Sequence, residues 1–208
     1  MKKIKLAIDV DDCVCNTVEM DFACAYYLNK QTKNLNKDFD NTYFDVTKTF
    51  DMTKEEGDNF YRKEKQFIMK NNDCMYPKVF VRKVLEKLKQ KGFEIYFVSG
   101  RDDSHWNNNS TKYLKKWLKT YKIPFNGVYS NVQNKNELCK KLEIDYLIED
   151  RIDYTEKANN DNIKTILIKQ SYNKEYSHNL NQFAENWLDL YCLLGEIYNF
   201  KTDDLISF

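Results

Sequence analysis

The stretch that decides the fold is IKLAIDVD, residues 4–11, in which a short apolar run leads directly into two carboxylates, Asp9 and Asp11. An apolar run of this length is typical of a strand buried in a parallel sheet. Ligands of open α/β sheets bind outside the carboxyl ends of the strands, where carboxylates can hold a hard cation or supply a nucleophile. Aspartates also cap turns, so this stretch alone leaves a functional site and a simple turn as alternatives.

Two further apolar runs, residues 94–98 and 144–148, also end in polar side chains. The residues that follow them are Ser99, Gly100, Arg101, Glu149 and Asp150. Between the two runs, Lys135 lies in a polar segment that opens a short amphipathic helix. Because the carboxyl ends of parallel strands meet at one edge of a sheet, we expect acids, a hydroxyl and a lysine to converge there, which favours a functional site.

Helical and strand patterns alternate from residue 76 onward. Helices are predicted over 79–90, 111–121 and 137–142, and strands over 94–98, 127–130 and 165–168, the last of these being the final core strand. Gly92 is placed to end the first of these helices. Repeated strand–helix units with short connections imply right-handed crossovers and helices on both faces of the sheet. We therefore predict a three-layer, Rossmann-like α/β fold with a parallel sheet.

Residues 18–73 interrupt this alternation, because they read as helical with an irregular, polar stretch over 40–51. We predict a core domain formed by residues 1–17 and 75–208 and a small helical cap formed by residues 18–74. A lid at this place would expel water from a reacting group and supply specificity contacts. The alternative is a helical hairpin that only completes the core.

Length and charge limit the partners of the protein. The 208 residues suit one domain or a core with a modest insertion, and the formal net charge is +1. This balance implies no global attraction to anionic membranes and weighs against long nucleic acid as a partner. The sequence shows neither a membrane-spanning apolar stretch nor a signal peptide, so we predict a cytoplasmic protein without a membrane association.

The cysteines and histidines are expected to have no metal or redox role. The six cysteines show no paired Cys-x-x-Cys spacing, and Cys13 and Cys15 lack the second pair of ligands that a zinc site needs. We interpret them as reduced thiols, some of them buried. His105 and His178 lie in polar surroundings without ligand spacing, and both are predicted to be exposed to solvent.

In order and spacing, the polar clusters resemble the four motifs of the haloacid dehalogenase-type phosphohydrolases. The matching residues, in motif order, are Asp9 with Asp11, Ser99, Lys135, and Glu149 with Asp150. Residues 165–174 and 187–191 also resemble the tail of the nucleotidase-like members, including the pyrimidine 5'(3')-deoxyribonucleotidases. One departure is Asp12, where many members have glycine; this extra carboxylate would either alter metal binding or face solvent.

The resemblance implies a Mg²⁺ site and an aspartyl-phosphate intermediate. It makes Asp9 the nucleophile and a metal ligand, with Asp150 as the second side-chain ligand and Glu149 in support. Asp11 would give its backbone carbonyl to the metal and use its side chain first as general acid and then as general base.

The phosphoryl group would be bound from the other strand ends. Ser99 and the backbone after it, at Gly100, would donate hydrogen bonds to phosphoryl oxygens, and Lys135 would neutralise both the nucleophile and the phosphate. Arg101 and Arg151 follow motif residues, but each could equally form a structural ion pair, so we leave both out of the catalytic set.

Three functions are compatible with this sequence. The leading hypothesis is a Mg²⁺-dependent 5'-nucleotidase that hydrolyses (deoxy)nucleoside monophosphates. A second is a phosphatase for another small phosphoester or a polynucleotide 3'-phosphatase, because residues 99–101 also resemble a motif of the polynucleotide kinase-phosphatases. A third is a non-catalytic binding protein, but the complete set of motif residues favours hydrolysis. Base preference and oligomeric state stay open.

Overall fold

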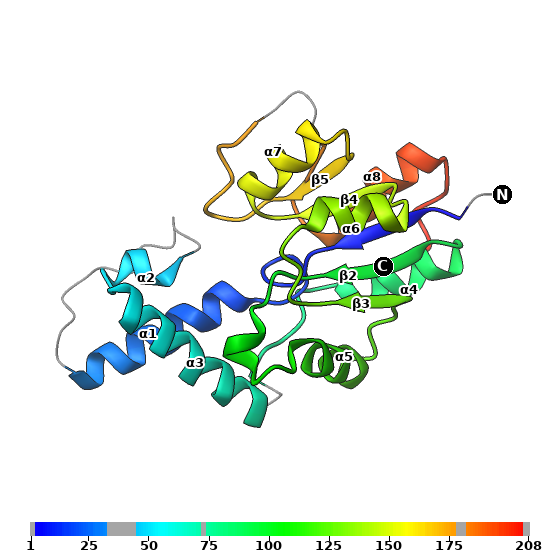
Figure 1. Cartoon of the computed structure of the whole chain (residues 1–208). Coiled ribbons are helices and arrows are strands. Elements are labelled where there is room, and N and C mark those ends of the chain that lie inside the picture. The colour runs from blue at the N-terminus through cyan, green and yellow to red at the C-terminus, as the bar shows by residue number, and fades with distance from the viewer. Residues whose placement is uncertain (1–2, 33–44, 72–73, 178–181, 206–208) are drawn as a thin grey trace.

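The computed structural model describes residues 3–32, 45–71, 74–177 and 182–205. Its centre is a six-stranded sheet in the order β3-β2-β1-β4-β5-β6, with every neighbouring pair parallel (Figure 1). The strands are β1 (Lys5–Ile8), β2 (Glu94–Val98), β3 (Gly127–Tyr129), β4 (Tyr146–Glu149), β5 (Thr165–Ile168) and β6 (Gln182–Ala184). In β1, Ile8 pairs with Phe97 on one side and with Ile148 on the other, so the first apolar run is the centre of the sheet.

Helices cover both faces of the sheet and form two separate apolar cores. Leu6 and Ile8 pack into the larger core with α4 (Val81–Gln90), α5 (Ser110–Thr120) and α8 (Trp187–Tyr198). The smaller core lies on the opposite face, where Ala7 packs near α6 (Lys135–Leu142) and α7 (Ile152–Asn160). The predicted three-layer, Rossmann-like parallel fold is therefore confirmed.

Three elements of the core were not predicted. The prediction that 165–168 is the final strand is wrong, because β6 follows it in the sheet. β6 has only three residues, too few for a periodic pattern in the sequence. α7 buries only Thr155 and Ala158, so it carries no apolar stripe that would indicate a helix. The short 3-10 helix η1 (Asp103–Trp106) is capped by Asp102, whose side chain accepts a hydrogen bond from the Ser104 amide at 2.8 Å.

Among the described residues between β1 and α4 are three helices, namely α1 (Thr17–Thr32), α2 (Val46–Thr49) and α3 (Lys54–Lys70). They bring together an apolar cluster of their own, formed by Phe22, Ala25, Val46 and Phe60. α2 falls inside the stretch predicted to be irregular, because Asp45 caps its first turn by accepting a hydrogen bond from the Thr47 amide at 3.0 Å. The remainder of that stretch up to residue 44 lies outside the described residues.

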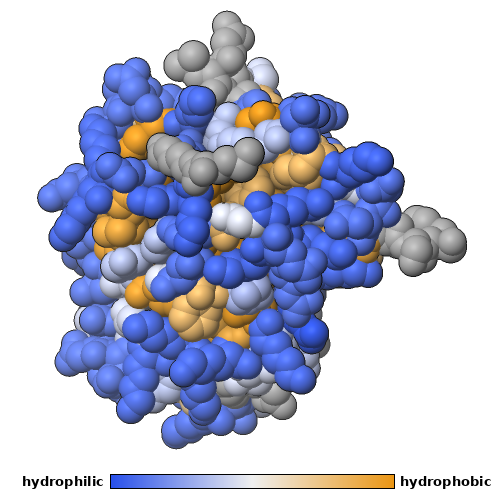
Figure 2. Space-filling view, turned by 90° about the vertical axis from the view of Figure 1, so that its right-hand side faces the viewer, coloured by the Kyte–Doolittle hydropathy of each residue, from blue (hydrophilic) through white to orange (hydrophobic). Residues whose placement is uncertain are grey.

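The surface is largely polar. On the face shown in Figure 2, hydrophilic side chains predominate, and hydrophobic ones form separate patches between them. None of the helices in the described part of the chain combines the length and the apolar character that a membrane crossing needs.

Candidate active site

The candidate site lies where the strand order reverses, between β1 and β4. Asp9 directly follows β1 and Asp150 directly follows β4, and the Asp9 amide donates a hydrogen bond of 2.9 Å to the carbonyl of Ile148. In open α/β sheets this reversal point opens a crevice at the carboxyl ends of the strands. The fold therefore places the two aspartates side by side in the position where such sheets bind ligands.

Lys135 joins two buried carboxylates. It is the first residue of α6, and its ammonium group forms ion pairs with Asp9 and, at 2.7 Å, with Glu149. Burial raises the pKa of Asp9 and raises that of Glu149 to about 7, although Lys135 opposes both shifts. Burial alone would lower the pKa of Lys135, but the two carboxylates raise it, so the lysine stays charged.

A second group of atoms suits a metal ion. Ligand atoms of Asp9, Cys13 and Asp150 all lie within 4.8 Å of one another. The two carboxylates fit Mg²⁺, which prefers oxygen ligands, whereas a thiol does not. Burial and nearby acids raise the pKa of Cys13, and its neutral thiol donates to Asp150 at 3.4 Å. Glu149, expected to support the metal, instead directs its carboxylate to Lys135 and to the amides of residues 150 and 151.

Asp150 is held by residues that sequence reasoning missed. The Tyr172 hydroxyl donates a hydrogen bond to the Asp150 carboxylate. The Asn173 side chain donates to the backbone carbonyls of Asp150, at 2.6 Å, and of Ile168, at 3.0 Å. Tyr172 and Asn173 follow closely after β5, which ends at Ile168. Polar residues after a parallel strand reach the same edge of the sheet as Asp9 and Asp150, so this position in the sequence could have indicated both residues.

Removing the Asp150 charge should stabilise the metal-free protein. Burial, followed by the nearby charge of Asp9, raises the Asp150 pKa from 3.8 to about 6. Ionising this group therefore costs about 3 kcal/mol of folding free energy above pH 6, and the cost disappears as the pH falls toward 4. We expect Asp150→Asn to unfold at higher urea than the wild type at pH 8 with chelator, and the gap to close at pH 4.

The matched control is Asp153→Asn, because Asp153 is exposed on α7 and should change the free energy of unfolding little. An Asp150→Asn variant less stable than the wild type at pH 8 would show that the buried, ionised carboxylate does not lower the free energy of unfolding.

Asp11 lies in a dense set of hydrogen-bond donors. Arg101 binds its carboxylate in a bidentate ion pair, with Nη2 at 2.8 Å from Oδ1 and Nε at 2.9 Å from Oδ2. Thr17 donates to Oδ1 at 2.7 Å, and Ser99 donates to Oδ2 at 3.4 Å. Burial alone would raise the Asp11 pKa, but Arg101 lowers it well below its usual range. Arg101, which the sequence left undecided, is thus an ion-pair partner, and its guanidinium also lies 4.7 Å from the Trp106 ring centroid.

These side chains surround one cavity of about 430 Å³. Its core side includes the predicted site residues Asp9, Asp11, Gly100, Lys135 and Asp150, while Ser99 is buried beside Asp11. Its other side comes from the inserted helices and η1 through Asp21, Tyr61, Lys65, His105 and Trp106. The cavity therefore lies between the sheet edge and the inserted helices.

Two polar residues near this cavity differ from expectation. His105 is half-buried, with its ring centroid 6.1 Å from that of Tyr61, so the prediction of an exposed histidine is wrong here; His178 lies outside the described residues. Asp12 is buried and accepts a hydrogen bond of 3.0 Å from the Val18 amide, so it caps the start of α1 instead of facing solvent. Its φ of 57° is left-handed, a backbone conformation that glycine adopts without steric cost.

The cysteines of the described chain are all free thiols, and Cys13, Cys15 and Cys139 are buried, as predicted. Burial raises the pKa of Cys139 to about 12, which keeps this thiol neutral.

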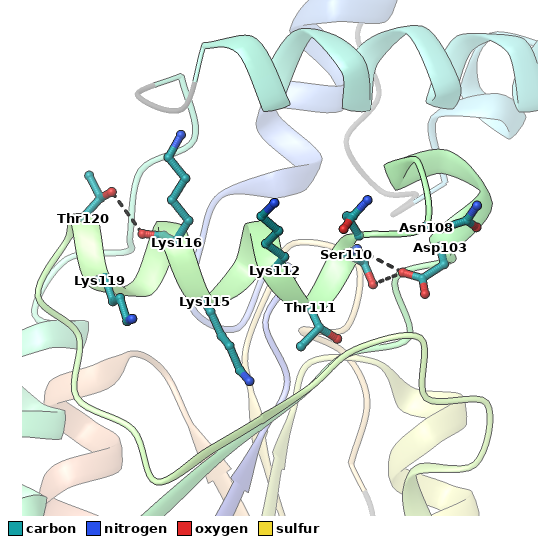
Figure 3. Close-up of a pocket in the computed structure, with 10 residues that line it drawn as sticks. Asp103, Asn108, Ser110, Thr111, Lys112, Lys115, Lys116, Lys119 and Thr120 are labelled. Atoms are coloured by element: carbon teal, nitrogen blue, oxygen red, sulfur yellow. Dashed lines mark hydrogen bonds between the residues drawn. The ribbon is translucent and has the colours of Figure 1, made fainter.

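A larger hollow of about 850 Å³ follows α5, but it lacks the chemistry of the cavity at the sheet edge. Lys112 and Lys116 extend to one side of this helix and Lys115 and Lys119 to the other (Figure 3). Asp103 is the only carboxylate among its lining residues and accepts a hydrogen bond from the Ser110 hydroxyl. Size therefore does not single out the candidate site; the converging acids and Lys135 do.

Comparison with known proteins places this geometry in context. No family model matches the chain. A protein of Oceanobacillus iheyensis, provisionally named a nucleotidase, is 23% identical over 194 residues, which cover 89% of this chain and 96% of that protein. A predicted phosphatase from Clostridium acetobutylicum has a TM-score of 0.68 at 15% identity, covering 94% of this chain and 100% of its own.

A haloacid dehalogenase-like hydrolase from Streptococcus pneumoniae has a TM-score of 0.66 at 14% identity, covering 92% of this chain and 98% of its own. These two likenesses each cover more than nine-tenths of this chain. The chain therefore has the haloacid dehalogenase-like fold, as its four motifs predicted.

Proposed function

We propose that this protein is a Mg²⁺-dependent phosphoric monoester hydrolase that forms a phosphoaspartate at Asp9, and that it acts as a 5'-nucleotidase on (deoxy)nucleoside monophosphates. The observation that carries the proposal is the convergence of Asp9, Asp11, Lys135 and Asp150 on one cavity, although they come from distant parts of the chain. The name of the Oceanobacillus relative supports a nucleotide as substrate. The fold supports the division into a core, residues 1–17 and 75–208, and a cap, residues 18–74.

The first step is an attack by a carboxylate oxygen of Asp9 on phosphorus, which forms the acyl phosphate and breaks the bond to the leaving oxygen. Both reactants are anionic, so the charge must be offset. Lys135 supplies one positive charge directly beside Asp9. Mg²⁺ held by Asp9 and Asp150 would neutralise further charge on the phosphoryl oxygens.

Asp11 is the proposed proton carrier. Its side chain would protonate the leaving alkoxide and later take a proton from the water that hydrolyses the phosphoaspartate. Arg101 keeps Asp11 ionised in the substrate-free site. An incoming phosphate is a competing anion for Arg101, and sharing the guanidinium with it would weaken this hold. Ser99 and the Gly100 backbone would bind the phosphoryl oxygens.

Phosphate release is the direct test of this function. We expect the protein to hydrolyse 5'-(deoxy)nucleoside monophosphates with Mg²⁺ and to lose about 10³-fold or more in rate with a chelator, because the carboxylate pair would then repel the substrate. The panel also contains 3'-nucleotides, sugar phosphates and 2-phosphoglycolate, which report on other small phosphoesters. Turnover that survives complete chelation would contradict the metal dependence, and phosphate release from none of the substrates would favour a binding protein.

A second candidate function, polynucleotide 3'-phosphatase, is favoured by the exposed lysines of α5. Lys112, Lys115, Lys116 and Lys119 project from a helix that begins shortly after η1, which lines the catalytic cavity. Exposed lysines on either side of this helix could hold phosphodiester groups. A 3'-phosphorylated oligonucleotide in the same panel tests this: higher kcat/KM than for the mononucleotide, with a steep fall as salt rises, would support it.

A further inference from the structure

A group of buried charged side chains lies where α1 and α3 meet, on the far side of the cavity from Asp9. The Lys65 ammonium is 3.1 Å from the Asp21 carboxylate and 2.8 Å from that of Glu64. Asp21 and Lys65 both line the cavity, whereas the Glu64 side chain is completely buried behind them. Lys65 is also close enough to Asp11 to lower its pKa.

This arrangement is costly as a purely structural device. Burying charges carries a desolvation penalty that their attraction often fails to exceed, and an apolar pair of similar volume usually stabilises as well. The same helices already pack through Phe22 and Phe60. Charged residues that face a cavity instead of this apolar cluster indicate a role toward what enters the cavity.

The charges on this side nearly cancel. The single Lys65 cation lies beside the two carboxyl groups of Asp21 and Glu64, and burial, followed by the nearby charge of Asp21, raises the Glu64 pKa well above its usual range. Arg151 also lines the cavity, but it is paired with Asp153 at 2.6 Å. A substrate carrying a second anionic group would therefore meet Asp21 without any surplus of positive charge.

A hydroxyl group suits this pair better than an anion does. A hydroxyl can accept a hydrogen bond from Lys65 and donate one to Asp21 at the same time. Beside the pair, the rings of Tyr61 and His105 lie 6.1 Å apart with an angle of 30° between their planes, and they form an aromatic wall of the cavity. A planar base next to a hydroxylated sugar matches both features.

We propose that Asp21 and Lys65 are specificity-determining residues that bind the sugar hydroxyl of a neutral nucleoside leaving group and disfavour leaving groups that carry a carboxylate. This inference rests on the proposed phosphohydrolase activity and assigns its substrate selection to one ion pair between the inserted helices.

The test compares three substrates that share the reacting phosphate. A 5'-nucleoside monophosphate offers hydroxyls, p-nitrophenyl phosphate offers none, and 2-phosphoglycolate offers a carboxylate. For Lys65→Met we expect KM to rise about tenfold more for the nucleotide than for p-nitrophenyl phosphate, because a charge-assisted hydrogen bond to the sugar hydroxyl is lost. p-Nitrophenyl phosphate, which offers no hydroxyl, reports the effect that the loss of Lys65 has on every substrate through Asp11. The matched control is Lys63→Met, because Lys63 is an exposed lysine of the same helix. This variant should change neither KM nor kcat for the nucleotide or for p-nitrophenyl phosphate.

A second variant gives a gain that misfolding cannot produce. Asp21→Asn combined with Glu64→Gln leaves Lys65 as an uncompensated cation, so kcat/KM for 2-phosphoglycolate should rise about tenfold relative to the nucleotide. Equal losses on all three substrates with Lys65→Met, or no gain with the double variant, would overturn the assignment. A wild-type protein that hydrolyses none of them would instead overturn the proposed function, and this is seen before any variant is made.

Discussion

An Asp9→Asn variant is expected to lose at least about 10⁴-fold in kcat while it stays folded, the size of loss seen when an enzyme nucleophile is removed. An amide cannot attack phosphorus to form an acyl phosphate, and no other described carboxylate occupies the position between Lys135 and Asp150. The measurement is steady-state phosphate release with Mg²⁺, together with thermal unfolding to show that the fold is retained.

The matched control for this variant is Asp12→Asn, the same chemical change in the same loop. Asparagine caps helices about as well as aspartate and tolerates the left-handed backbone of residue 12, so turnover should stay close to that of the wild type. Asp9→Asn protein that keeps substantial activity would rule out the phosphoaspartate at this residue.

The second large effect is expected from Lys135→Met, which should lower the free energy of unfolding by about 3–5 kcal/mol as well as abolish turnover. Removing the ammonium leaves Asp9 and Glu149 buried without a cation, and breaking a buried ion pair at one partner costs about this much. Urea unfolding at pH 8 with chelator measures the loss without a contribution from bound metal.

Adding Glu149→Gln to this variant separates stability from catalysis. The double variant removes one of the two unpaired charges, so it should regain part of the free energy of unfolding but none of the activity, since Lys135 also offsets charge on the phosphoryl group. If Lys135→Met unfolds at the wild-type urea concentration, the lysine has no structural role and only its catalytic assignment stands.

Much of the core could be predicted from the sequence because its strands are continuous apolar runs. The predicted strands at 94–98 and 165–168 coincide with β2 and β5, since a polar residue, Ser99 or Lys169, directly follows each run. The expected inserted helices are also present, as α1 and α3. β6 and α7 escaped because a three-residue edge strand and a helix with two buried residues carry almost no periodic signal.

The site could be predicted as a set of residues but not as a network of partners. The motifs and the strand ends indicated Asp9, Lys135 and Asp150, which do converge. Which acid pairs with which base depends on tertiary geometry, so the sequence could not show that Arg101 binds Asp11 or that Tyr172 donates to Asp150. The sequence also could not show how deeply the acids of the site are buried, and this burial is the largest cause of their raised pKa values.

The position of β1 in the sheet bears on the order of events during synthesis. This strand is synthesised before the other five, yet Ile8 pairs with Phe97 and Ile148. In the loop after it, the carbonyl of Asp12 accepts a hydrogen bond from Gln170, and that of Cys13 accepts one from Trp187. Contacts this distant in the chain form slowly. The candidate site can therefore assemble fully only after residue 187 has been synthesised, so nascent fragments that end before it should carry the acids without the proposed activity.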